Sequence, residues 1–349
     1  MKLLIVVAPM VSRGGVYSWL HEATPVLRGA GWEVGVLWAS RVEAEAPAAD
    51  WSRRVGEGRG RLGRMRALPR AIEGAIEGFA PDRILSVLPQ SDLACAQAVK
   101  GRARWTAMAH GQPFPAAGEG SLGRRVLWRQ AVAWAYRRAD AVVAVSDALG
   151  ETLAAELGVA DCHTVHNGVR LPPSDSLRPR RGRTVGFLGR LSPEKAPDLF
   201  LDCVREVDCR ALLFGDGPLL GTVRAEAAEM PDVRVEGWAD RDRALERVDL
   251  LLVPSRREAF GLSCVEAGAR GIPVLARDVD GLGEILAPDP VLREHCLLPA
   301  NAKPAAFRER LRLLLDDEQK RVQLGSRLRS QVERNFALPD QVLALANLL

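Results

Sequence analysis

Short hydrophobic runs alternate with helical segments along the chain. The run LLIVVA at residues 3–8 predicts a buried strand, because short apolar runs rich in β-branched residues are typical of parallel sheets. Further strands are expected at residues 33–39, 82–88, 104–110, 140–146 and 162–169. Helices are expected at residues 17–29, 66–79, 124–138 and 147–157. This alternation predicts an α/β domain with a parallel sheet and helices on both faces.

The same alternation begins again after a break. Residues 171–183 (LPPSDSLRPRRGR) are rich in Pro and Arg and have no apolar period, so they predict a linker. New strands are expected at residues 184–190, 210–217, 233–237, 249–255 and 273–277. The sequence therefore predicts two Rossmann-like, doubly wound domains, at residues 1–170 and 184–335.

Two such sheets predict where a ligand binds. Ligands of doubly wound sheets lie at the carboxyl ends of the strands, so we expect the two domains to face a central cleft. A last apolar helix at residues 336–349 follows. It either crosses back to the N-terminal domain or caps its own domain.

Composition fits two globular domains. The chain has 349 residues, of which 47% are hydrophobic and 26% are charged. Its six Cys are scattered without a CxxC pair, which favours buried thiols in a reducing compartment over a metal site. The opening MKLLIVVAPM is too short for a signal peptide, and no run of 18 apolar residues spans a membrane. We therefore predict a cytoplasmic protein.

The net charge of +4 is unevenly spread. Residues 51–70 contain seven Arg and one acid, and residues 121–138 contain five Arg and no acid. Such clusters favour an anionic partner. The segment 121–138 also places Trp128, Val132 and Ala135 on one helical face, so one hypothesis is peripheral binding to the inner, anionic face of a membrane. The alternative is a helix packed on its sheet with Arg in water.

The segment 51–70 has two interpretations of its own, as a mobile loop near the acceptor or as a solvated loop. The same positive charge is compatible with nucleic acid. No base-reading motif accompanies it, so we expect no nucleic-acid partner.

The strongest chemical signal is REAFGLSCVEAGARGIPV at residues 257–274. Glu258 is expected on the loop after a strand, and Glu266 one turn into the next helix. Free N–H groups at Leu262 and Ser263 would favour a bound phosphate. Glu266 can accept hydrogen bonds from ribose, and Glu258 from a sugar. Taken alone, both glutamates can equally be ordinary acids at a helix N-terminus.

Three further clusters change that balance. Gly189 and Arg190 end a strand, and Lys195 follows in GRLSPEKAPDLFLD; a guanidinium and an ammonium suit two successive phosphates. The turn in LFGDGPLL, which contains Gly215, lets a flat base approach the backbone. Gly14 and Gly15 follow the first strand, at the corresponding edge of the other sheet.

Six segments in this order resemble glycosyltransferase family four (glycosyl transferases group 1), a retaining family with the GT-B fold. They are SRGGVYSWLHEATPVLRGAGWEVGVL, AVVAVSDALGETL, TVHNGVRLP, GRLSPEKAPDLFLD, LFGDGPLL and EAFGLSCVEAGARGIPVLA. One departure lies at Asp280 to Glu284, where many members have a Gly-Gly turn near the donor. The contacts there are expected to differ.

The resemblance implies roles for the residues of the donor site. Arg190 and Lys195 would bind the donor diphosphate and stabilise the leaving group. Glu266 would hold the ribose, and Glu258 would contact the donor sugar. The backbone of the donor loop would meet the sugar and phosphates, at Phe260, Gly261, Leu262 and Ser263.

The resemblance also implies roles in the N-terminal domain. Gly15 would let the first loop approach the diphosphate. His110, at the end of strand 104–110, matches the histidine that the family places beside the reacting sugar. Without the resemblance, a lone His at a strand end is more often structural.

The implied activity is that of a retaining hexosyltransferase. The donor would be a UDP- or GDP-sugar, and the acceptor a hydroxyl of a glycan, glycolipid or small molecule, as in polysaccharide biosynthesis. Transfer would proceed by same-face substitution. Because Arg190 and Lys195 can stabilise the leaving diphosphate, we expect no metal and no cofactor.

Three rival activities follow from the same architecture. A dinucleotide oxidoreductase is disfavoured because APMVSRGG lacks GxGxxG. A sugar-nucleotide epimerase of the same fold remains an alternative. A non-catalytic sugar-binding scaffold is the other alternative. A protein without activity can lose the donor-site residues, so their presence argues against a scaffold; they are Arg190, Lys195, Glu258 and Glu266.

Overall fold

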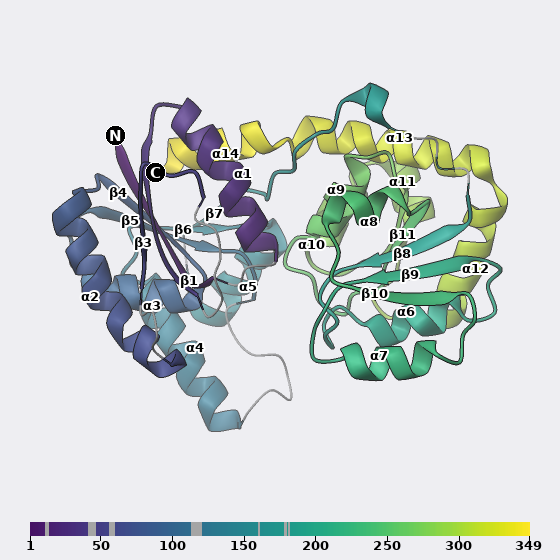
Figure 1. The fold of residues 1–349 in the computed structure, drawn as a ribbon, viewed down its shortest axis with the longest axis horizontal. Helices are drawn as coiled ribbons and strands as arrows, with labels where there is room; N and C mark the ends of the chain where they lie inside the picture. The colour runs from purple at the N-terminus through teal and green to yellow at the C-terminus, as the bar shows by residue number, and fades with distance from the viewer. Residues whose placement is uncertain are drawn as a thin grey trace. The chain divides into compact units, whose positions relative to one another are not determined.

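A computed structural model describes residues 1–10, 14–40, 47–55, 60–112, 121–159, 161–177, 180 and 182–349. The chain forms two compact units (Figure 1). The first unit contains Met1–Gly168 and Leu338–Leu349, and the second contains Val169–Ala337.

The first unit is built on a seven-stranded parallel sheet with the order β3-β2-β1-β4-β5-β6-β7. The strands are β1 (Lys2–Met10), β2 (Glu33–Ser40), β3 (Trp51–Arg54), β4 (Arg83–Val87), β5 (Arg104–Ala109), β6 (Ala141–Ala144) and β7 (Cys162–Thr164). The order reverses between β1 and β4, which makes this the switch point of the sheet.

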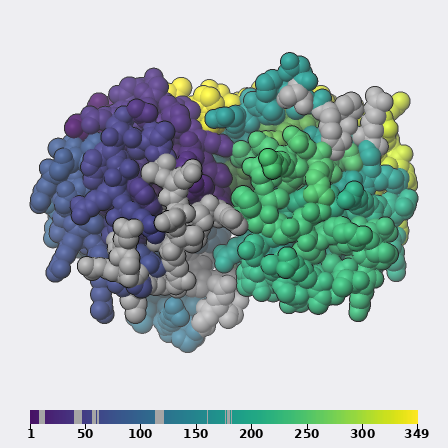
Figure 2. Space-filling view, in the orientation of Figure 1, coloured from purple at the N-terminus to yellow at the C-terminus, as the bar shows by residue number. Residues whose placement is uncertain are grey.

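Helices cover both faces of this sheet. They are α1 (Gly15–Gly29), α2 (Arg61–Phe79), α3 (Pro89–Ala98), α4 (Leu122–Tyr136), α5 (Asp147–Leu157) and α14 (Leu338–Leu348). Helices α1 and α14 lie side by side on one face, whereas α2, α3 and α4 pack in succession on the other (Figure 1). Figure 2 shows the yellow atoms of α14 beside the purple atoms of α1. The last helix thus belongs to the first unit.

The interpretation of residues 51–70 as a loop is wrong for much of the segment. Residues Trp51–Arg54 form β3, the edge strand paired with β2, and α2 begins at Arg61. The Trp51 ring stacks on Phe79 of α2 with 5.6 Å between centroids. This strand contains Ser and two Arg instead of an apolar run, so its residues alone do not indicate a strand. Its pairing with β2 and the Trp51 ring contact hold it in place. Residues 56–59 lie outside the described residues.

The second unit is built on a six-stranded parallel sheet with the order β10-β9-β8-β11-β12-β13. The strands are β8 (Thr184–Leu188), β9 (Arg210–Phe214), β10 (Val233–Gly237), β11 (Leu250–Val253), β12 (Val274–Arg277) and β13 (Leu297–Leu298). The strand order reverses between β8 and β11.

Helices again cover both faces. They are α6 (Pro197–Val204), α7 (Leu220–Ala227), α8 (Arg241–Glu246), α9 (Leu262–Gly268), α10 (Gly281–Leu286), α11 (Pro290–Cys296), α12 (Pro304–Asp316) and α13 (Glu318–Asn335). Helices α6, α7 and α12 lie on one face, and α13 packs with α9, α10 and α11 on the other (Figure 1). Each unit is therefore a doubly wound α/β domain.

The segment predicted as a linker is packed into the second unit. Arg180 is buried, and its guanidinium donates hydrogen bonds to the carbonyl oxygens of Leu245, Val248 and Arg270. Residues Ser174–Ser176 form a short 3₁₀ helix, and Ser174 accepts a hydrogen bond from Arg329. The described part of 171–183 is thus attached to one unit rather than extended between two.

Helix α4 divides into two halves. Its second half is buried at Val132, Ala135 and Tyr136, and the helix packs against α3 and α5. In the first half, Leu122 is 75% exposed and Leu127 is 68% exposed. No described helix is both long enough and apolar enough to cross a bilayer.

Candidate functional site

The predicted donor residues converge at the switch point of the second sheet. Gly189 and Arg190 directly follow β8, and Glu258 lies on the loop between β11 and α9. Because β8 and β11 are parallel neighbours, their carboxyl ends meet at one edge of the sheet. Side chains that follow the two strands are therefore close in space, although almost 70 residues separate them in sequence.

Glycine is required where the loops after β8 and β9 touch. A Cβ atom on Gly215 would lie 1.8 Å from the carbonyl oxygen of Gly189, and Gly215 has a φ of 151°. A Cβ atom on Gly217 would lie 2.4 Å from the carbonyl oxygen of Leu191. No larger residue fits this packing, so the glycines bring two loops into backbone contact.

Lys195 and Glu258 form an ion pair. The Lys195 ammonium lies 2.5 Å from each carboxylate oxygen of Glu258. The Glu258 side chain is 8% exposed and that of Lys195 is 28% exposed. Ser255 also donates a hydrogen bond to Glu258 at 3.3 Å. From the sequence, these two charges are expected at different parts of the donor, whereas in the structure they pair with each other.

Backbone hydrogen bonds hold the loops that carry this pair. The N–H groups of Arg256 and Arg257 donate to the carbonyl oxygen of Glu194, next to Lys195. Arg256 also forms an ion pair with Asp198 of α6 at 2.5 Å. This contact holds the pKa of the Asp198 carboxyl below its usual value.

Asp280, which departs from the family pattern, helps to hold the loop that carries Glu258. Its carboxylate accepts a hydrogen bond from the backbone N–H of Glu258 at 2.8 Å. Its φ of 44° is unusual for a residue other than Gly, and such strain is often found at functional sites. The following Gly281 leaves no room for a side chain, because a Cβ atom would lie 2.5 Å from Phe260 Cα. The departure thus builds a specific contact between two loops.

The beginning of α9 has the expected position, but Phe260 has a structural side chain. The Phe260 ring is buried and packs edge-on against Phe336 with centroids 5.4 Å apart. Gly261 caps the helix with a φ of 114°, and Leu262 and Ser263 are half-buried. Any role of Phe260 toward a ligand therefore belongs to its backbone.

Glu266 has a partner that the sequence did not indicate. Arg241 of α8 forms an ion pair with its carboxylate at 3.1 Å, and the Glu266 side chain is 12% exposed. Arg270 donates to the carbonyl oxygen of Glu266, and Asp242 binds Arg270 in turn. Arg241 lies 25 residues away in sequence, on another helix. Only the packing of α8 beside α9 brings the two together.

Arg190 differs from the other charges of this site. Its side chain is exposed, and no described residue forms an ion pair or a side-chain hydrogen bond with its guanidinium. It follows β8 directly, beside the Gly189–Gly215 contact. A guanidinium in this position offers a planar fork of donors to an anion.

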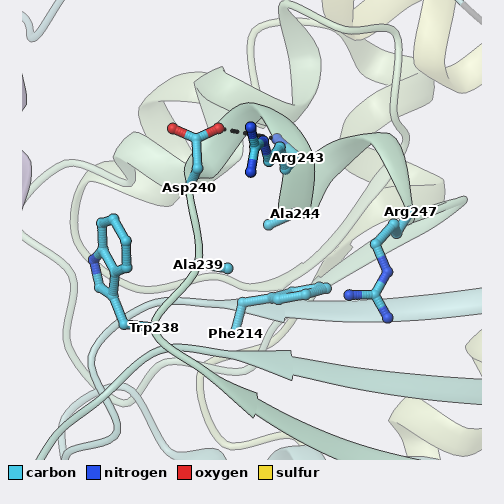
Figure 3. A pocket seen from close by; sticks show the side chains of 7 residues that line it. All are labelled: Phe214, Trp238, Ala239, Asp240, Arg243, Ala244 and Arg247. Atoms are coloured by element: carbon cyan, nitrogen blue, oxygen red, sulfur yellow. Dashed lines mark hydrogen bonds between the residues drawn. The ribbon is translucent and has the colours of Figure 1, made fainter.

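A shallow pocket of about 350 Å³ lies at the carboxyl ends of β9 and β10 (Figure 3). Trp238 is 50% exposed and forms one wall, and Phe214 lies at the base. The Arg247 guanidinium is 5.3 Å from the centre of the Phe214 ring. The N–H of Gly215 donates to Gly237 at 2.7 Å, which connects the pocket to the glycine turn.

The remaining predicted residues belong to the first unit. Gly14 is the N-cap of α1, with a φ of 151°, and Gly15 is the first residue of that helix. Residues 11–13, which precede them, lie outside the described residues. His110 follows β5, and its ring meets the edge of Trp19 with centroids 4.8 Å apart. Burial lowers the pKa of His110 to about 3, so its imidazole is neutral at physiological pH.

Comparison with known families agrees with this arrangement. The model of Glycosyltransferase Family 4 matches residues 13–171, and that of Glycosyl transferases group 1 matches residues 182–317. The matches fall on successive parts of the chain and cover every strand of the two sheets except β1. The chain belongs to glycosyltransferase family 4 (group 1).

Curated relatives of this chain match only in part. A D-inositol 3-phosphate glycosyltransferase from Corynebacterium efficiens is 32% identical over 189 residues, which cover 49% of this chain and 43% of the relative. The chain thus spans about half the length of the curated relatives it matches.

Solved structures share the fold along the whole chain. Sucrose-phosphate synthase from Thermosynechococcus elongatus has a TM-score of 0.83 at 19% identity, covering 100% of this chain and 98% of its own. HepE of Anabaena, in complex with UDP-glucose, has a TM-score of 0.78 at 19% identity, covering 99% and 100%. The chain therefore has the GT-B fold that its sequence predicts.

Proposed function

We propose that this glycosyltransferase transfers a hexose from a nucleotide-diphosphate sugar to a hydroxyl group, and that Arg190 binds the donor diphosphate. The observation that carries the proposal is Arg190, an exposed guanidinium without a partner among the described residues. Arg190 stands at the switch point of the sheet. The Lys195–Glu258 ion pair, with 2.5 Å between its charged atoms, lies on the loops that follow β8 and β11. Charge-assisted, bidentate hydrogen bonds to phosphate are the strongest that a side chain of this kind forms.

The other donor contacts follow from the loops. Lys195 would meet the second phosphate while Glu258 holds its ammonium in place. Glu258 would also accept a hydrogen bond from the sugar, and Glu266 from the ribose. Arg241 already contacts the Glu266 carboxylate at 3.1 Å. To bind ribose, this carboxylate must accept hydrogen bonds from the ribose hydroxyls and from Arg241 together.

The base would lie near the glycine turn. Gly215 permits close approach to the backbone, and Trp238 offers a half-exposed aromatic face in the adjoining pocket. A flat base stacks favourably on such a ring. HepE, which shares the fold, was solved with UDP-glucose, and this favours a uridine donor; a GDP-sugar remains the alternative.

The proposed chemistry is same-face substitution with retention. Negative charge develops on the leaving diphosphate as the glycosidic bond breaks. The positive groups of Arg190 and Lys195 stabilise that charge, so we propose that transfer needs no metal and no cofactor. Unchanged turnover in excess EDTA is the expected result, and loss of turnover that Mg²⁺ restores would contradict it.

The acceptor is a hydroxyl of a glycan, glycolipid or small molecule. The D-inositol 3-phosphate relative, by its name, acts on a small phosphorylated acceptor. A lipopolysaccharide core mannosyltransferase of Rhizobium meliloti is 28% identical over 242 residues and favours a role in polysaccharide biosynthesis.

Helix α4 supports a peripheral membrane contact. Leu122, Val126 and Leu127 are exposed, and Arg124 and Arg125 lie among them. Apolar side chains beside arginines suit the interface of an anionic bilayer, whereas neutral lipid lacks the charge. We propose that this half-helix binds anionic lipid.

Vesicle sedimentation tests this contact. The protein should sediment with phosphatidylglycerol vesicles and not with phosphatidylcholine vesicles. The double variant Leu122→Asp/Leu127→Asp should stay in the supernatant. Leu313→Asp is the matched control, because Leu313 of α12 is also exposed, at 61%. Equal loss in both variants would exclude a specific role for α4.

Nucleotide binding tests the main proposal. Thermal unfolding is measured with UDP, GDP, ADP and their sugar conjugates. A nucleotide at a hundred times its Kd should stabilise the protein by about 2.7 kcal/mol. Arg190→Ala should weaken that binding by roughly 10- to 100-fold, because a hydrogen bond to a charged group contributes about 1.5–3 kcal/mol.

The control is Arg293→Ala. Arg293 of α11 is also exposed and has no side-chain partner among the described residues, so its loss should leave nucleotide binding unchanged. The proposal fails if no nucleotide stabilises the protein, or if the two variants bind equally well.

A further inference from the structure

The main chain of Glu258 is held at both of its polar groups by a single loop. Its N–H donates a hydrogen bond to the Asp280 carboxylate at 2.8 Å, and its carbonyl oxygen accepts one from the N–H of Gly281 at 3.2 Å. Asp280 lies 22 residues beyond Glu258 in sequence, directly before α10. Two hydrogen bonds to neighbouring residues leave the Glu258 backbone little freedom to rotate.

The direction of the Glu258 side chain therefore depends on this loop. Its carboxylate is 8% exposed, pairs with the Lys195 ammonium and accepts a hydrogen bond from Ser255. A buried charge is unfavourable unless its partner stays within reach, so the backbone that aims this carboxylate must be well placed. Asp280 thus acts on the position of Glu258 and, through it, on that of Lys195.

Asp280 makes this contact from a strained backbone. Its φ is 44° and its ψ is −131°, a combination that residues with a Cβ atom rarely adopt and that glycine adopts without strain. The residue is exposed, and no described residue forms an ion pair with its carboxylate. Core packing therefore does not account for an Asp here, and the hydrogen bond to Glu258 is the contact that a glycine would lose.

We propose that Asp280 is a positioning residue, whose carboxylate fixes Glu258 for contact with the donor sugar at the expense of backbone strain. Such strain persists only where the surrounding structure holds it, and it is common at functional sites. Contact between Glu258 and the donor rests on the proposed function. The hold of Asp280 on Glu258 does not, so the two can be tested separately.

Amide hydrogen exchange tests this hold without any donor. Asp280→Gly removes the carboxylate and the strain but keeps the N–H of Gly281. The Glu258 amide should exchange roughly 10-fold faster or more, as expected when a hydrogen bond to a charged group is lost. The melting temperature should stay the same or rise, because glycine relieves the strain. Asp280→Asn, which keeps an acceptor oxygen, should retain slow exchange.

The matched control is Asp317→Gly. Asp317 is also exposed, and its carboxylate accepts a hydrogen bond from the backbone N–H of Lys320, likewise at 2.8 Å. Its φ of −112° is ordinary, so glycine relieves no strain there. This variant should melt at a slightly lower temperature, because a helix cap is lost. Exchange at Glu258 and turnover should not change.

Turnover provides the second measurement. With a donor chosen from the nucleotide panel, Asp280→Gly should lower kcat by roughly 10- to 100-fold, because a misplaced group near the reacting sugar slows the chemical step. The donor KM should change less, and Asp280→Asn should keep most of the turnover. Adding Asp280→Gly to Glu258→Ala should cause no further loss, because Asp280 acts through Glu258.

Each outcome decides between a positioning and a purely structural role. A lower melting temperature of Asp280→Gly, with exchange at Glu258 and turnover as in the wild type, overturns the proposal. Faster exchange with an unchanged kcat overturns it as well. Faster exchange at Glu258, in a protein whose wild type transfers sugar from no donor, supports the hold of Asp280 on Glu258 and rejects the proposed activity.

Discussion

At the scale of single residues, the site of the second unit consists of paired charges and one unpaired charge. Glu258 holds Lys195, and Glu266 holds Arg241, whereas Arg190 has no partner among the described residues. The two ion pairs orient the four side chains that form them, because a partly buried charge has a lower free energy when its partner stays close. The unpaired guanidinium is the group most available to an anion.

Breaking the Lys195–Glu258 pair should destabilise the fold. Lys195→Met leaves a carboxylate that is 8% exposed without its cation. We expect a loss of about 1–3 kcal/mol in the free energy of unfolding, as for a buried polar group left unsatisfied. Urea unfolding measures it.

A double-mutant cycle provides the control. Lys195→Met combined with Glu258→Gln should recover part of the loss, because the uncompensated charge is removed. Strictly additive effects would mean that the pair contributes no coupling.

Asp92 should make stability depend on pH. It is buried in the first unit, where Ser86 donates to it at 2.6 Å, and burial raises its pKa to about 7. Its folded pKa lies above its unfolded value of 3.8. The contribution to stability is therefore fully present below pH 3.8 and is lost as pH rises to about 7.

The test compares urea unfolding of wild type and Asp92→Asn from pH 5 to pH 8. The free energy of unfolding of the wild type should fall relative to the variant by about 1.4 kcal/mol per pH unit up to pH 7, and then level off. A constant difference across this range would show that Asp92 does not titrate there.

At the scale of secondary structure, loops rather than helices define the site. The turns after β8, β9 and β11 are held by glycine contacts and by backbone hydrogen bonds such as those to Glu194. Gly215, with its φ of 151°, is the tightest of these contacts. Loop geometry at the carboxyl edge should therefore be sensitive to a single methyl group.

Gly215→Ala should disturb the site more than an ordinary glycine substitution. The added Cβ would lie 1.8 Å from a carbonyl oxygen, so the loop must move, at a cost of about 1–3 kcal/mol. Nucleotide affinity should fall as well. Gly221→Ala is the matched control, because its Cβ meets nothing within 4 Å in α7. It should be neutral or slightly stabilising. Equal effects of the two substitutions on calorimetric melting would contradict the prediction.

At the scale of the whole molecule, each unit has its own core, and the chain passes between them twice. The crossings follow Gly168 and Ala337, and Val169 pairs with Ala337 in an isolated parallel bridge. Helix α14 buries Leu338, Val342 and Leu345 in the first unit. The Arg83 guanidinium also donates to the carbonyl oxygen of Leu349. The stability of the first unit therefore depends on the end of the chain.

Leu345→Ala should destabilise the first unit alone. Leu345 is 1% exposed, so removing its side chain should cost about 2–5 kcal/mol. Tryptophan fluorescence reports mainly on this unit, because only Trp238 lies in the second. Its transition should move to lower urea while nucleotide binding persists. Leu343→Ala, at a 43% exposed position, should change little. Equal shifts of the urea transition in Leu345→Ala and Leu343→Ala would contradict a stabilising role of α14 in the first unit.

Much of the fold could be predicted from local patterns. The helix at 147–157 is found at Asp147–Leu157, and strand 233–237 at Val233–Gly237. Edge strand β3, with Ser and Arg at its centre, and the two-residue β13 carry no such pattern and were missed. Helix α3 was also missed, because half its residues are buried and no amphipathic period results.

For the candidate site, sequence spacing identified residue types but not partners. Gly189 and Gly215 were singled out separately and prove to touch, and Arg241 was not singled out at all.

The sequence by itself determined the two α/β repeats, the glycine turns and the family, because side-chain period and backbone freedom are local properties. Only the tertiary structure decided that Lys195 pairs with Glu258, that Arg241 holds Glu266, and that α14 joins the first unit. These contacts join residues 25 to more than 300 positions apart. They depend on the order of strands in each sheet and on side-chain packing across it, which no local pattern of residues encodes.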